Sequence, residues 1–328
     1  MGDRELVNSR EEFAELSVKG EFCKFPAISI EGNCVIILGK WLRIATIKDE
    51  EWLPGDVVGN PEHILAGLQK DRRGADIYKF SQKLPSIQPK YTYHLEWTNV
   101  AAIPTTSFTD WWENRLPQVT RKNVRRAGRR GVVVKGVDFD DTLIEGIVKL
   151  NNSSAFRQRH RFVHYGKSFD AVKKDYSDFM DRSEYLGAYI QGELIGIIRL
   201  IHMGEITSIL QLLCMQKHSD KRPANALIAR AVELCAERGI RYLLYGQYTY
   251  GVNTKAPLSE FKRRNGFEKF LLPSYYVPLS IKGRLAIRLK LHMGIKNALP
   301  KPVMKIAYGV RRKILDLRKE EPLGGDAE

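Results

Sequence analysis

The 328-residue sequence has little cysteine and no long apolar run. Its four cysteines, Cys23, Cys34, Cys214 and Cys235, lie far apart and form no CxxC pair, which argues against a disulfide framework and a cysteine zinc site. No window approaches eighteen unbroken apolar residues, and the charged opening MGDRELVNSREEF contains no hydrophobic signal region. We therefore expect a cytoplasmic protein, in a reducing compartment. We do not expect it to span a membrane.

The sequence motifs of several enzyme classes are also missing. No GxSxG, P-loop or GxGxxG motif occurs, so serine hydrolase, NTPase and dinucleotide-binding functions are poor hypotheses. His160 and His164 have the i, i+4 spacing of a helical metal site, but no HExxH glutamate follows and no third ligand is evident. The sequence therefore predicts no metal site.

Positive charge, by contrast, is abundant and concentrated. The formal net charge is +15, and the stretch from Arg115 to Arg130 holds seven basic residues and no acidic one. From Ser280 to the end there are twelve basic residues against five acidic ones. Such clusters attract polyanions, phosphorylated ligands or an anionic bilayer, although a solvated surface would explain them as well.

The apolar fraction of 43% is sufficient for a sizeable core, and the chain length favours two domains. In the first half, patterning predicts two β-rich runs within 33–58 joined near Gly39, a helix from Pro61 to about Gln69, and strands within 74–85 and 90–104. A basic helix follows from Ser107, and Pro117 predicts a break or kink in it.

The second half has clearer punctuation between its elements. We expect an antiparallel meander of three strands at 184–190, 193–203 and 205–215, because only QG and G separate them. The other expected elements are a strand at 131–137, helices at 138–153 and 167–180, a helix at 224–238, a strand at 241–246, a helix at 257–264 ended by Asn265–Gly266, and a strand through Tyr275 and Tyr276.

The element order from Val132 to Leu279 resembles the acyl-CoA transferase fold of the GNAT superfamily. LIGIIRL is similar to its third strand, RPANALIARAVELCAERGIRYL to its cofactor loop, helix and fifth strand, and EFKRRNGF to its fourth helix with a Gly-Phe turn. The FK pair, the basic run TRKNVRRAGRRGV and a β-rich first domain also resemble the FemAB-type aminoacyltransferases of peptidoglycan bridges and their acetyltransferase-like relatives.

The resemblance implies an α+β protein of tandem GNAT-like domains, with a mixed, mostly antiparallel sheet flanked by helices. We expect an N-terminal GNAT-like domain over 1–130, a C-terminal GNAT-like acyltransferase domain over 131–279, and a basic helical tail over 280–328. It also implies that the fourth and fifth strands of the second domain part and leave a gap for the acyl donor.

Lys262 matches the lysine of the FemAB-type FK pair, where a cation contacts the donor or stabilises charge on the reacting carbonyl. An exposed lysine near a helix C-terminus is the alternative interpretation. The GNAT tyrosine that protonates the departing thiolate is missing at this position, so Tyr245, Tyr250, Tyr275 or Tyr276 is expected to replace it. Glu205 is the candidate base, unless the amine proton leaves through water. The predicted catalytic residues are Lys262, Tyr245, Tyr276 and Glu205.

The loop KHSDKRPANAL stands where GNAT enzymes wrap the cofactor diphosphate with glycine-bearing backbone, and it contains no glycine. Basic side chains are expected to supply the missing interactions. The predicted donor-binding residues are Gln211, Leu213, Lys217, Lys221, Arg222, Ala224 and Asn225. The expected donor is acetyl-CoA or another acyl-CoA, with aminoacyl-tRNA as the alternative that the FemAB-type resemblance implies.

The run RQRHRFVHYGKS lies where the GNAT fold borders the acceptor. A carboxylate or phosphate on the acceptor would suit bidentate arginines. The predicted acceptor-binding residues are Arg157, Gln158, His164, Tyr165 and Tyr250. The acceptor implied is a small-molecule or lipid-linked amine.

The tail carries an apolar stripe, Val303, Ile306, Val310, Ile314 and Leu317, with basic residues on its other side. The stripe either packs on the enzyme or, with the rest of 280–319, contacts an anionic membrane. Three functions therefore stay open: an acyl-CoA-dependent N-acyltransferase, an aminoacyl-tRNA-dependent ligase, and a non-catalytic binding module. DNA is not an expected partner.

Overall fold

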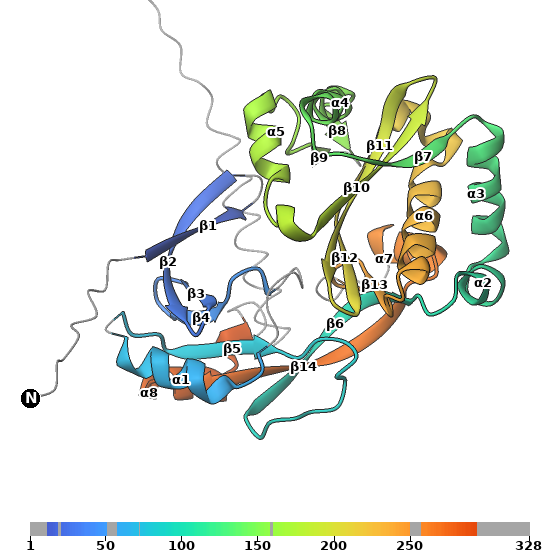
Figure 1. The fold of residues 1–328 in the computed structure, drawn as a ribbon. Coiled ribbons are helices and arrows are strands. Elements are labelled where there is room, and N and C mark those ends of the chain that lie inside the picture. The colour runs from blue at the N-terminus through green and yellow to red at the C-terminus, as the bar shows by residue number, and fades with distance from the viewer. Residues whose placement is uncertain are drawn as a thin grey trace, which may run out of the picture.

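The structure is a computed structural model of the chain and describes residues 12–18, 21–50, 58–71, 73–157, 160–249 and 257–293. Within these residues one sheet of twelve strands runs through the molecule (Figure 1). Its strand order is β1-β2-β3-β4-β5-β14-β6-β13-β12-β11-β10-β7. The pairs are antiparallel except β4–β5 and β12–β13, which confirms the expected mixed, mostly antiparallel sheet.

The first half supplies six of these strands. β3 ends at Leu38 and β4 begins at Ile44, so the chain turns near Gly39 as predicted, and Asn60 caps α1 by accepting from the Glu62 N–H. The elements are β1 (Glu12–Val18), β2 (Glu21–Ile30), β3 (Asn33–Leu38), β4 (Ile44–Ile47), α1 (Pro61–Lys70), β5 (Ile77–Ser81) and β6 (His94–Pro104).

The predicted break in the basic helix occurs at Pro117. Ser107 caps α2 (Phe108–Asp110), which continues as a π-helical turn, η2 (Trp111–Arg115), and α3 (Gln118–Arg129) begins after the proline. A proline cannot donate to the preceding turn, so the two helical segments take different directions. The basic residues of the run therefore lie mainly on the separate helix α3.

The second half follows the predicted order. The antiparallel meander is present, and Asp140 caps the helix that follows the first strand by accepting from the Leu143 N–H at 2.8 Å. The elements are β7 (Val133–Val137), α4 (Asp141–Asn152), β8 (Phe156–Arg157), β9 (His160–Arg161), α5 (Phe169–Tyr176), η3 (Met180–Arg182), β10 (Ser183–Ile190), β11 (Glu193–Met203), β12 (Ile206–Cys214), η4 (Gln216–Lys221), α6 (Pro223–Glu237), β13 (Tyr242–Leu244), α7 (Pro257–Arg264), β14 (Glu268–Pro278), α8 (Ile281–Arg288) and η5 (Leu291–Met293).

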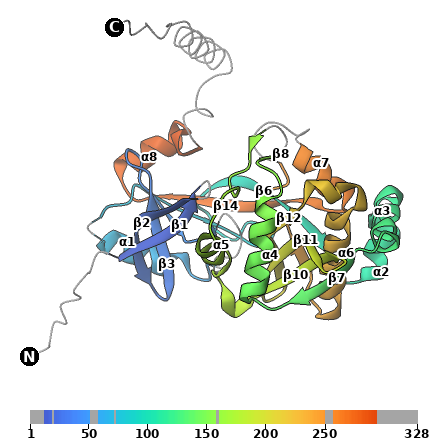
Figure 2. The same ribbon diagram turned by 90° about the horizontal axis from the view of Figure 1, so that it is seen from above.

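β14 links the two halves of the chain. It lies between β5 and β6, pairing antiparallel with both, and Tyr275 packs in the core of the first half with Phe80 and Tyr78. A strand from the second half of the chain therefore pairs with strands of the first half, across the expected domain boundary at residue 130. Separate helices cover the sheet: α3 and α6 pack on one face of the second half, and α4 and α5 on the other (Figures 1 and 2).

α8 is fastened to the start of β5. Ser280 caps α8 by accepting from the Gly283 N–H, and its hydroxyl also bonds Asp76 at 2.8 Å. A Cβ on Gly283 would lie 1.9 Å from the Asp76 carbonyl oxygen, so only glycine permits this approach. The predicted amphipathic stripe of the tail, from Val303 to Leu317, lies outside the described residues.

Candidate functional site: a gap between two parallel strands

The strands β12 and β13 pair only at their beginning. Their ladder joins Ile206–Ser208 to Tyr242–Leu244, after which β12 continues to Cys214 and β13 ends. The chain beyond β13 follows β6 instead, with the Tyr245 N–H donating to the Ala101 carbonyl at 2.9 Å. Among the described residues the two strands therefore separate, which is the gap that the sequence predicts.

A pocket of about 600 Å³ lies beside the free end of β12. Its lining comes from the end of β12, the first turn of α6, one side of α3 and the last turn of α7, and no acidic residue is part of it. The lining residues are Pro117, Val119, Thr120, Asn123, Cys214, Met215, Gln216, Ser219, Arg222, Pro223, Ala224, Asn225, Phe261, Arg263, Arg264 and Asn265.

The first turn of α6 gives this pocket an electropositive end. Arg222 has a left-handed backbone (φ +60°) and Pro223 opens the helix, so the chain turns sharply into α6 without glycine. No side chain of the described residues caps the helix, which leaves its positive dipole end for a ligand. Three arginines, Arg222, Arg263 and Arg264, line the same pocket, and Arg263 and Arg264 also pair with Glu260 at 2.7 Å. The arrangement suits phosphate oxygens.

The turn after α7 is fixed against both neighbouring helices. Asn225 of α6 donates to the Asn265 side chain at 2.8 Å, and Thr120 of α3 donates to the Arg264 carbonyl at 2.6 Å. Gly266 has φ +78°, and a Cβ there would lie 2.7 Å from Trp111 Nε1. The Asn-Gly turn therefore serves both to end α7 and to let it approach the buried Trp111.

Lys262 is buried and is not part of the pocket lining. Its ammonium group donates to the Gln247 carbonyl at 2.5 Å and lies 4.6 Å from the centre of the Tyr245 ring. Burial lowers the pKa of Lys262 to about 8. The exposed-helix interpretation of this lysine is therefore wrong, and the structure brings Lys262 and Tyr245 together where β13 ends.

A second group of polar side chains lies across β12, beneath the β8–β9 hairpin. Arg199 is fully buried beside the rings of Tyr176 and Tyr185, and Gln211 is its neighbour on β12. Arg157 stacks on Phe162 at 4.0 Å. Burial lowers the pKa of both guanidinium groups, and Arg157 and Arg199 each act electrostatically on the Tyr176 hydroxyl.

Several atoms of this group have no hydrogen-bond partner among the described residues. They are Arg157 Nε and Nη2, Arg199 Nε, Gln211 Oε1 and the Tyr176 hydroxyl. Buried polar groups are normally satisfied, so a concentration of unsatisfied ones beside the gap indicates a place for a polar ligand. Its two cations favour an anionic group.

The other described residues predicted to bind donor or acceptor lie outside the pocket lining. Leu213 packs on the α4–α5 side, Lys217 pairs with Glu193 at 2.7 Å, and Lys221 lies near Asp220 and His218, so none of the three lines the pocket. His164 lies 3.6 Å from Asp175, and Tyr165 is exposed. Gln158 and Tyr250 are outside the described residues.

Glu205 and Tyr276 are not brought to the gap. Glu205 pairs with Arg241 at the start of β12, whereas the pocket adjoins the end of that strand. Tyr276 lies opposite His94, at the other end of β14 from α7 and roughly 27 Å along the strand from Glu268. Conversely, Arg263, Arg264 and Asn265 were not predicted, although the EFKRRNGF run contains them. Asn123 gave no signal beyond its place in a basic helix.

The fold, with its gap between β12 and β13, is similar to that of FemX, of a lysylphosphatidylglycerol synthetase domain and of L-PGS, in agreement with the GNAT-like fold that the sequence resemblance implies. No protein-family model and no curated protein matches the sequence. Among solved structures, FemX shares 10% identity over 84% of this chain and 90% of its own, with a TM-score of 0.55. The C-terminal domain of a protein described as a lysylphosphatidylglycerol synthetase from Agrobacterium fabrum shares 13% identity (80% and 87% covered, TM-score 0.53). L-PGS from Bacillus licheniformis shares 15% (81% and 88%, TM-score 0.52).

Proposed function

We propose that this protein is an N-acyltransferase that moves an acyl group, in the first instance acetyl from acetyl-CoA, to an amine of a cell-envelope or polysaccharide precursor. The observation that carries the proposal is the gap between β12 and β13 with an electropositive pocket at its end. A thioester can lie along the unpaired edge of β12, whose backbone groups are free of a neighbouring strand. Its diphosphate then reaches the first turn of α6 and the arginines.

The chemistry proposed for the gap is direct transfer. The acceptor nitrogen attacks the thioester carbonyl, the new C–N bond forms and the C–S bond breaks. The Lys262 ammonium group stabilises negative charge on the carbonyl oxygen, and the Tyr245 hydroxyl protonates the thiolate. The proton of the amine leaves through water, because Glu205 lies at the other end of β12. The site then contributes mainly by aligning the two reactants.

The acceptor is proposed to enter from the side of the β8–β9 hairpin. Arg157 and Arg199 would bind an anionic group of the acceptor, such as a carboxylate or phosphate, with Gln211 as a further polar contact. A precursor that carries both an amine and an acidic group meets these demands. Its free amine would then extend toward β12.

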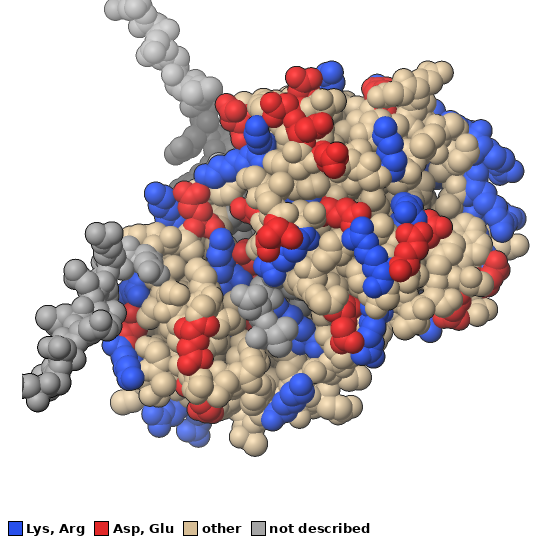
Figure 3. Space-filling view, viewed as in Figure 1, with Lys and Arg blue, Asp and Glu red and all other residues tan. Residues whose placement is uncertain are grey.

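A second candidate donor, aminoacyl-tRNA, is favoured by the surface of α3. Lys122, Arg125, Arg126, Arg129 and Arg130 line a hollow of about 590 Å³ that shares Asn123 with the donor pocket. Figure 3 shows this basic surface at the edge formed by α3. A polynucleotide backbone bound there would lead its end to the gap.

The test of both candidates is ligand-dependent stabilisation of the purified protein. Acetyl-CoA at concentrations above its Kd should raise Tm, and dephospho-CoA, which keeps the diphosphate, should do so too. Charged tRNA should instead bind with a steep dependence on salt. Stabilisation by CoA compounds alone supports the first proposal and binding of tRNA alone supports the second. If neither CoA compounds nor tRNA bind, both proposals are overturned and a non-catalytic module is favoured.

We further infer that α8 contacts an anionic membrane, which would suit a lipid-linked acceptor. Ile281, Leu285 and Leu289 are exposed on one side of α8, while Ala286 and Ile287 are buried on the other. The exposed Trp41 adjoins this side through Lys282, which lies over its ring at 5.1 Å. Arg284, Arg288 and Lys290 are also exposed there. Among the helices of the described residues, none combines the length and apolar character needed to cross a bilayer.

A further inference from the structure

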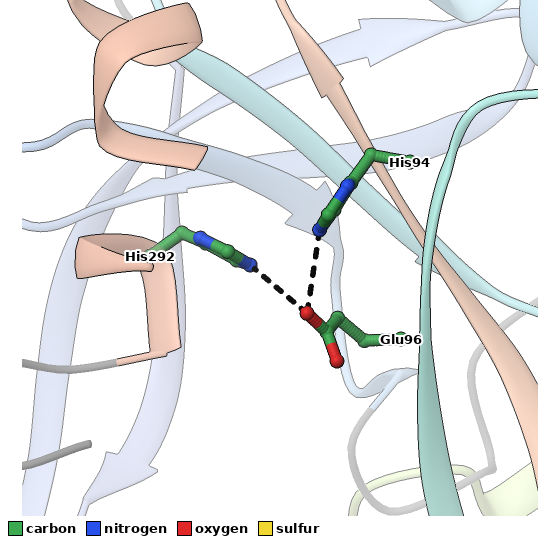
Figure 4. A group of neighbouring side chains, drawn as sticks. All are labelled: His94, Glu96 and His292. Carbon is green, nitrogen blue, oxygen red and sulfur yellow. Dashed lines mark hydrogen bonds and ion pairs between the residues drawn. The ribbon is translucent and has the colours of Figure 1, made fainter. Parts of the chain in front are cut away.

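Three potential metal ligands meet at the start of β6, at the opposite end of that strand from its pairing with β13. His94 and Glu96 are alternate residues of β6, so both side chains leave the same face of the strand. His292 reaches them from η5, which follows α8 (Figure 4). Glu96 Oε1 lies 3.3 Å from His94 Nε2 and 3.9 Å from His292 Nε2, and the three ligand atoms all lie within 4.8 Å of one another.

His292 is held with one particular nitrogen toward the group. The side chain is buried, packs at 4.6 Å against the Tyr276 ring and lies 5.5 Å from the His94 ring. Its Nδ1 faces the Ala286 carbonyl at 3.5 Å, which favours the tautomer with the proton on Nδ1 and the lone pair on Nε2. No described residue hydrogen-bonds that Nε2. A backbone carbonyl that fixes the tautomer in this way is the usual support of a metal-binding histidine.

We propose that His94, Glu96 and His292 bind a divalent transition metal ion such as Zn²⁺. Tetrahedral bonds of 2.0–2.1 Å would place the ligand atoms roughly 3.3 Å apart. The separation of Glu96 Oε1 from His94 Nε2 already has this value. His292 Nε2 lies 3.9 Å from the same oxygen, and the two histidine nitrogens lie within 4.8 Å of one another, so the three ligand atoms would have to move closer together to hold the ion. Two imidazoles with one carboxylate suit zinc and neighbouring metals rather than calcium or magnesium, which prefer oxygen ligands.

The site is independent of the proposed transfer reaction. His94 is opposite Tyr276 on β14, whereas the gap lies at the level where Ala102 is opposite Glu268 and Leu244. A bound ion would instead join η5 to β6 and so fix the chain immediately after α8. Three protein ligands leave one coordination position for water.

The competing explanation is an ordinary polar contact, in which His94 donates to Glu96 and His292 is only a buried aromatic ring. The two explanations differ in what Glu96 does. In an ordinary contact its loss changes stability slightly and metal content not at all. In a metal site its loss removes one of three ligands while leaving the half-exposed surface of β6 intact.

The test uses the full chain without a histidine tag, stripped with chelator and then titrated with Zn²⁺ or Co²⁺. We expect one ion per chain, with a four-coordinate Co²⁺ absorption band and a rise in Tm. Glu96→Gln and His94→Asn should each weaken binding at least tenfold and abolish the band, with circular dichroism unchanged. His63→Ala is the matched control, because His63 faces only Glu31 in an exposed pair on the same half of the chain.

Equal metal affinity in the wild type and in Glu96→Gln would overturn the proposal, as would no uptake at micromolar metal. His292→Asn provides a third ligand test. If that buried variant unfolds, the two variants on β6 still decide the matter. An acyl-transfer assay is not part of the readout, so failure of the metal proposal and failure of the proposed function are distinguishable.

Discussion

At the scale of single residues, Lys262 combines complete burial with an ionisable group. Among the described residues, its amine contacts the Gln247 carbonyl and the face of the Tyr245 ring. Burial lowers the pKa of Lys262 to about 8. Such a lysine is still mostly protonated near neutral pH. It is therefore available as a cation under ordinary conditions but loses its charge under mildly alkaline ones.

The first prediction concerns the activity of Lys262 variants. Lys262→Met should lower kcat by roughly 100-fold or more while leaving the circular dichroism spectrum unchanged, because charge stabilisation is lost but side-chain volume is kept. In the wild type, kcat should fall as pH rises through about 8, since the ammonium form is the active one. A rate that instead rises through this pH would assign Lys262 the role of base, and unchanged kinetics in the variant would remove it from the mechanism.

The second prediction concerns the turn at Gly266. Gly266→Ala should lower the free energy of unfolding by about 2 kcal/mol or more, because the new methyl group meets Trp111 at a backbone with positive φ. Gly239→Ala is the control: Gly239 also has positive φ, but a Cβ there meets nothing within 4 Å. It should cost only about 1 kcal/mol of backbone strain. Equal losses in urea unfolding would show that contact with Trp111 does not constrain the turn.

At the scale of elements, the chain enters α6 through a turn that contains no glycine. Arg222 takes the left-handed conformation and its side chain is exposed at the pocket, while Pro223 fixes the first turn. The helix end supplies backbone N–H groups, and the arginines of α7 supply further charge from the opposite wall. The start of α6 therefore provides oriented backbone N–H groups, and α7 provides much of the positive charge.

The third prediction follows from this division. Arg222→Ala and Arg263→Ala should each weaken acetyl-CoA binding about tenfold, the effect expected when one charge-assisted hydrogen bond is lost. Arg230→Ala is the control, because Arg230 pairs with Glu233 and Glu237 as Arg263 pairs with Glu260, but only Arg263 lines the pocket. Isothermal titration provides the measurement. An effect of Arg230→Ala as large as the other two would mean that only the general charge of α6 matters.

At the scale of the whole molecule, the basic surface of α3 and the exposed apolar residues of α8 lie on different parts. The basic surface of α3 is at one end of the sheet, and α8 packs on β5 and β14 near the other (Figures 1 and 3). An enzyme that took a polar donor at one end and approached a membrane with the other would need such a separation. This arrangement motivates the final prediction.

The fourth prediction concerns vesicle binding. The wild type should sediment with vesicles that contain anionic lipid and much less with neutral ones, because each cation near the surface contributes about 1 kcal/mol. Replacing Ile281 and Leu285 by serine should reduce sedimentation several-fold. Val133→Ser, at an equally exposed apolar residue of β7, is the control. Binding that is insensitive to the α8 variant would place membrane contact elsewhere or exclude it.

Local sequence patterns were sufficient for most elements. The caps at Asn60, Ser107 and Asp140, the break at Pro117 and the turn at Gly266 lie where local chemistry predicts them, because each depends on residues a few positions apart. The fold class could also be predicted, since the order of elements and several short motifs resemble a known superfamily. For the candidate site, the resemblance pointed to the turn at the start of α6, and Arg222, Ala224 and Asn225 of that turn line the pocket.

What the sequence by itself determined was therefore the elements, their order and the turn at the start of α6. Only the tertiary structure decided that β14 lies between β5 and β6, that Lys262 is buried, and that Glu205 and Tyr276 lie away from the gap. It alone placed His292 beside His94 and Glu96. The physical reason is the distance along the chain over which residues interact. Caps and turns depend on neighbouring residues. The burial of a side chain, and the meeting of side chains from distant segments, depend on which strands pair, and strand pairing depends on the packing of the whole sheet.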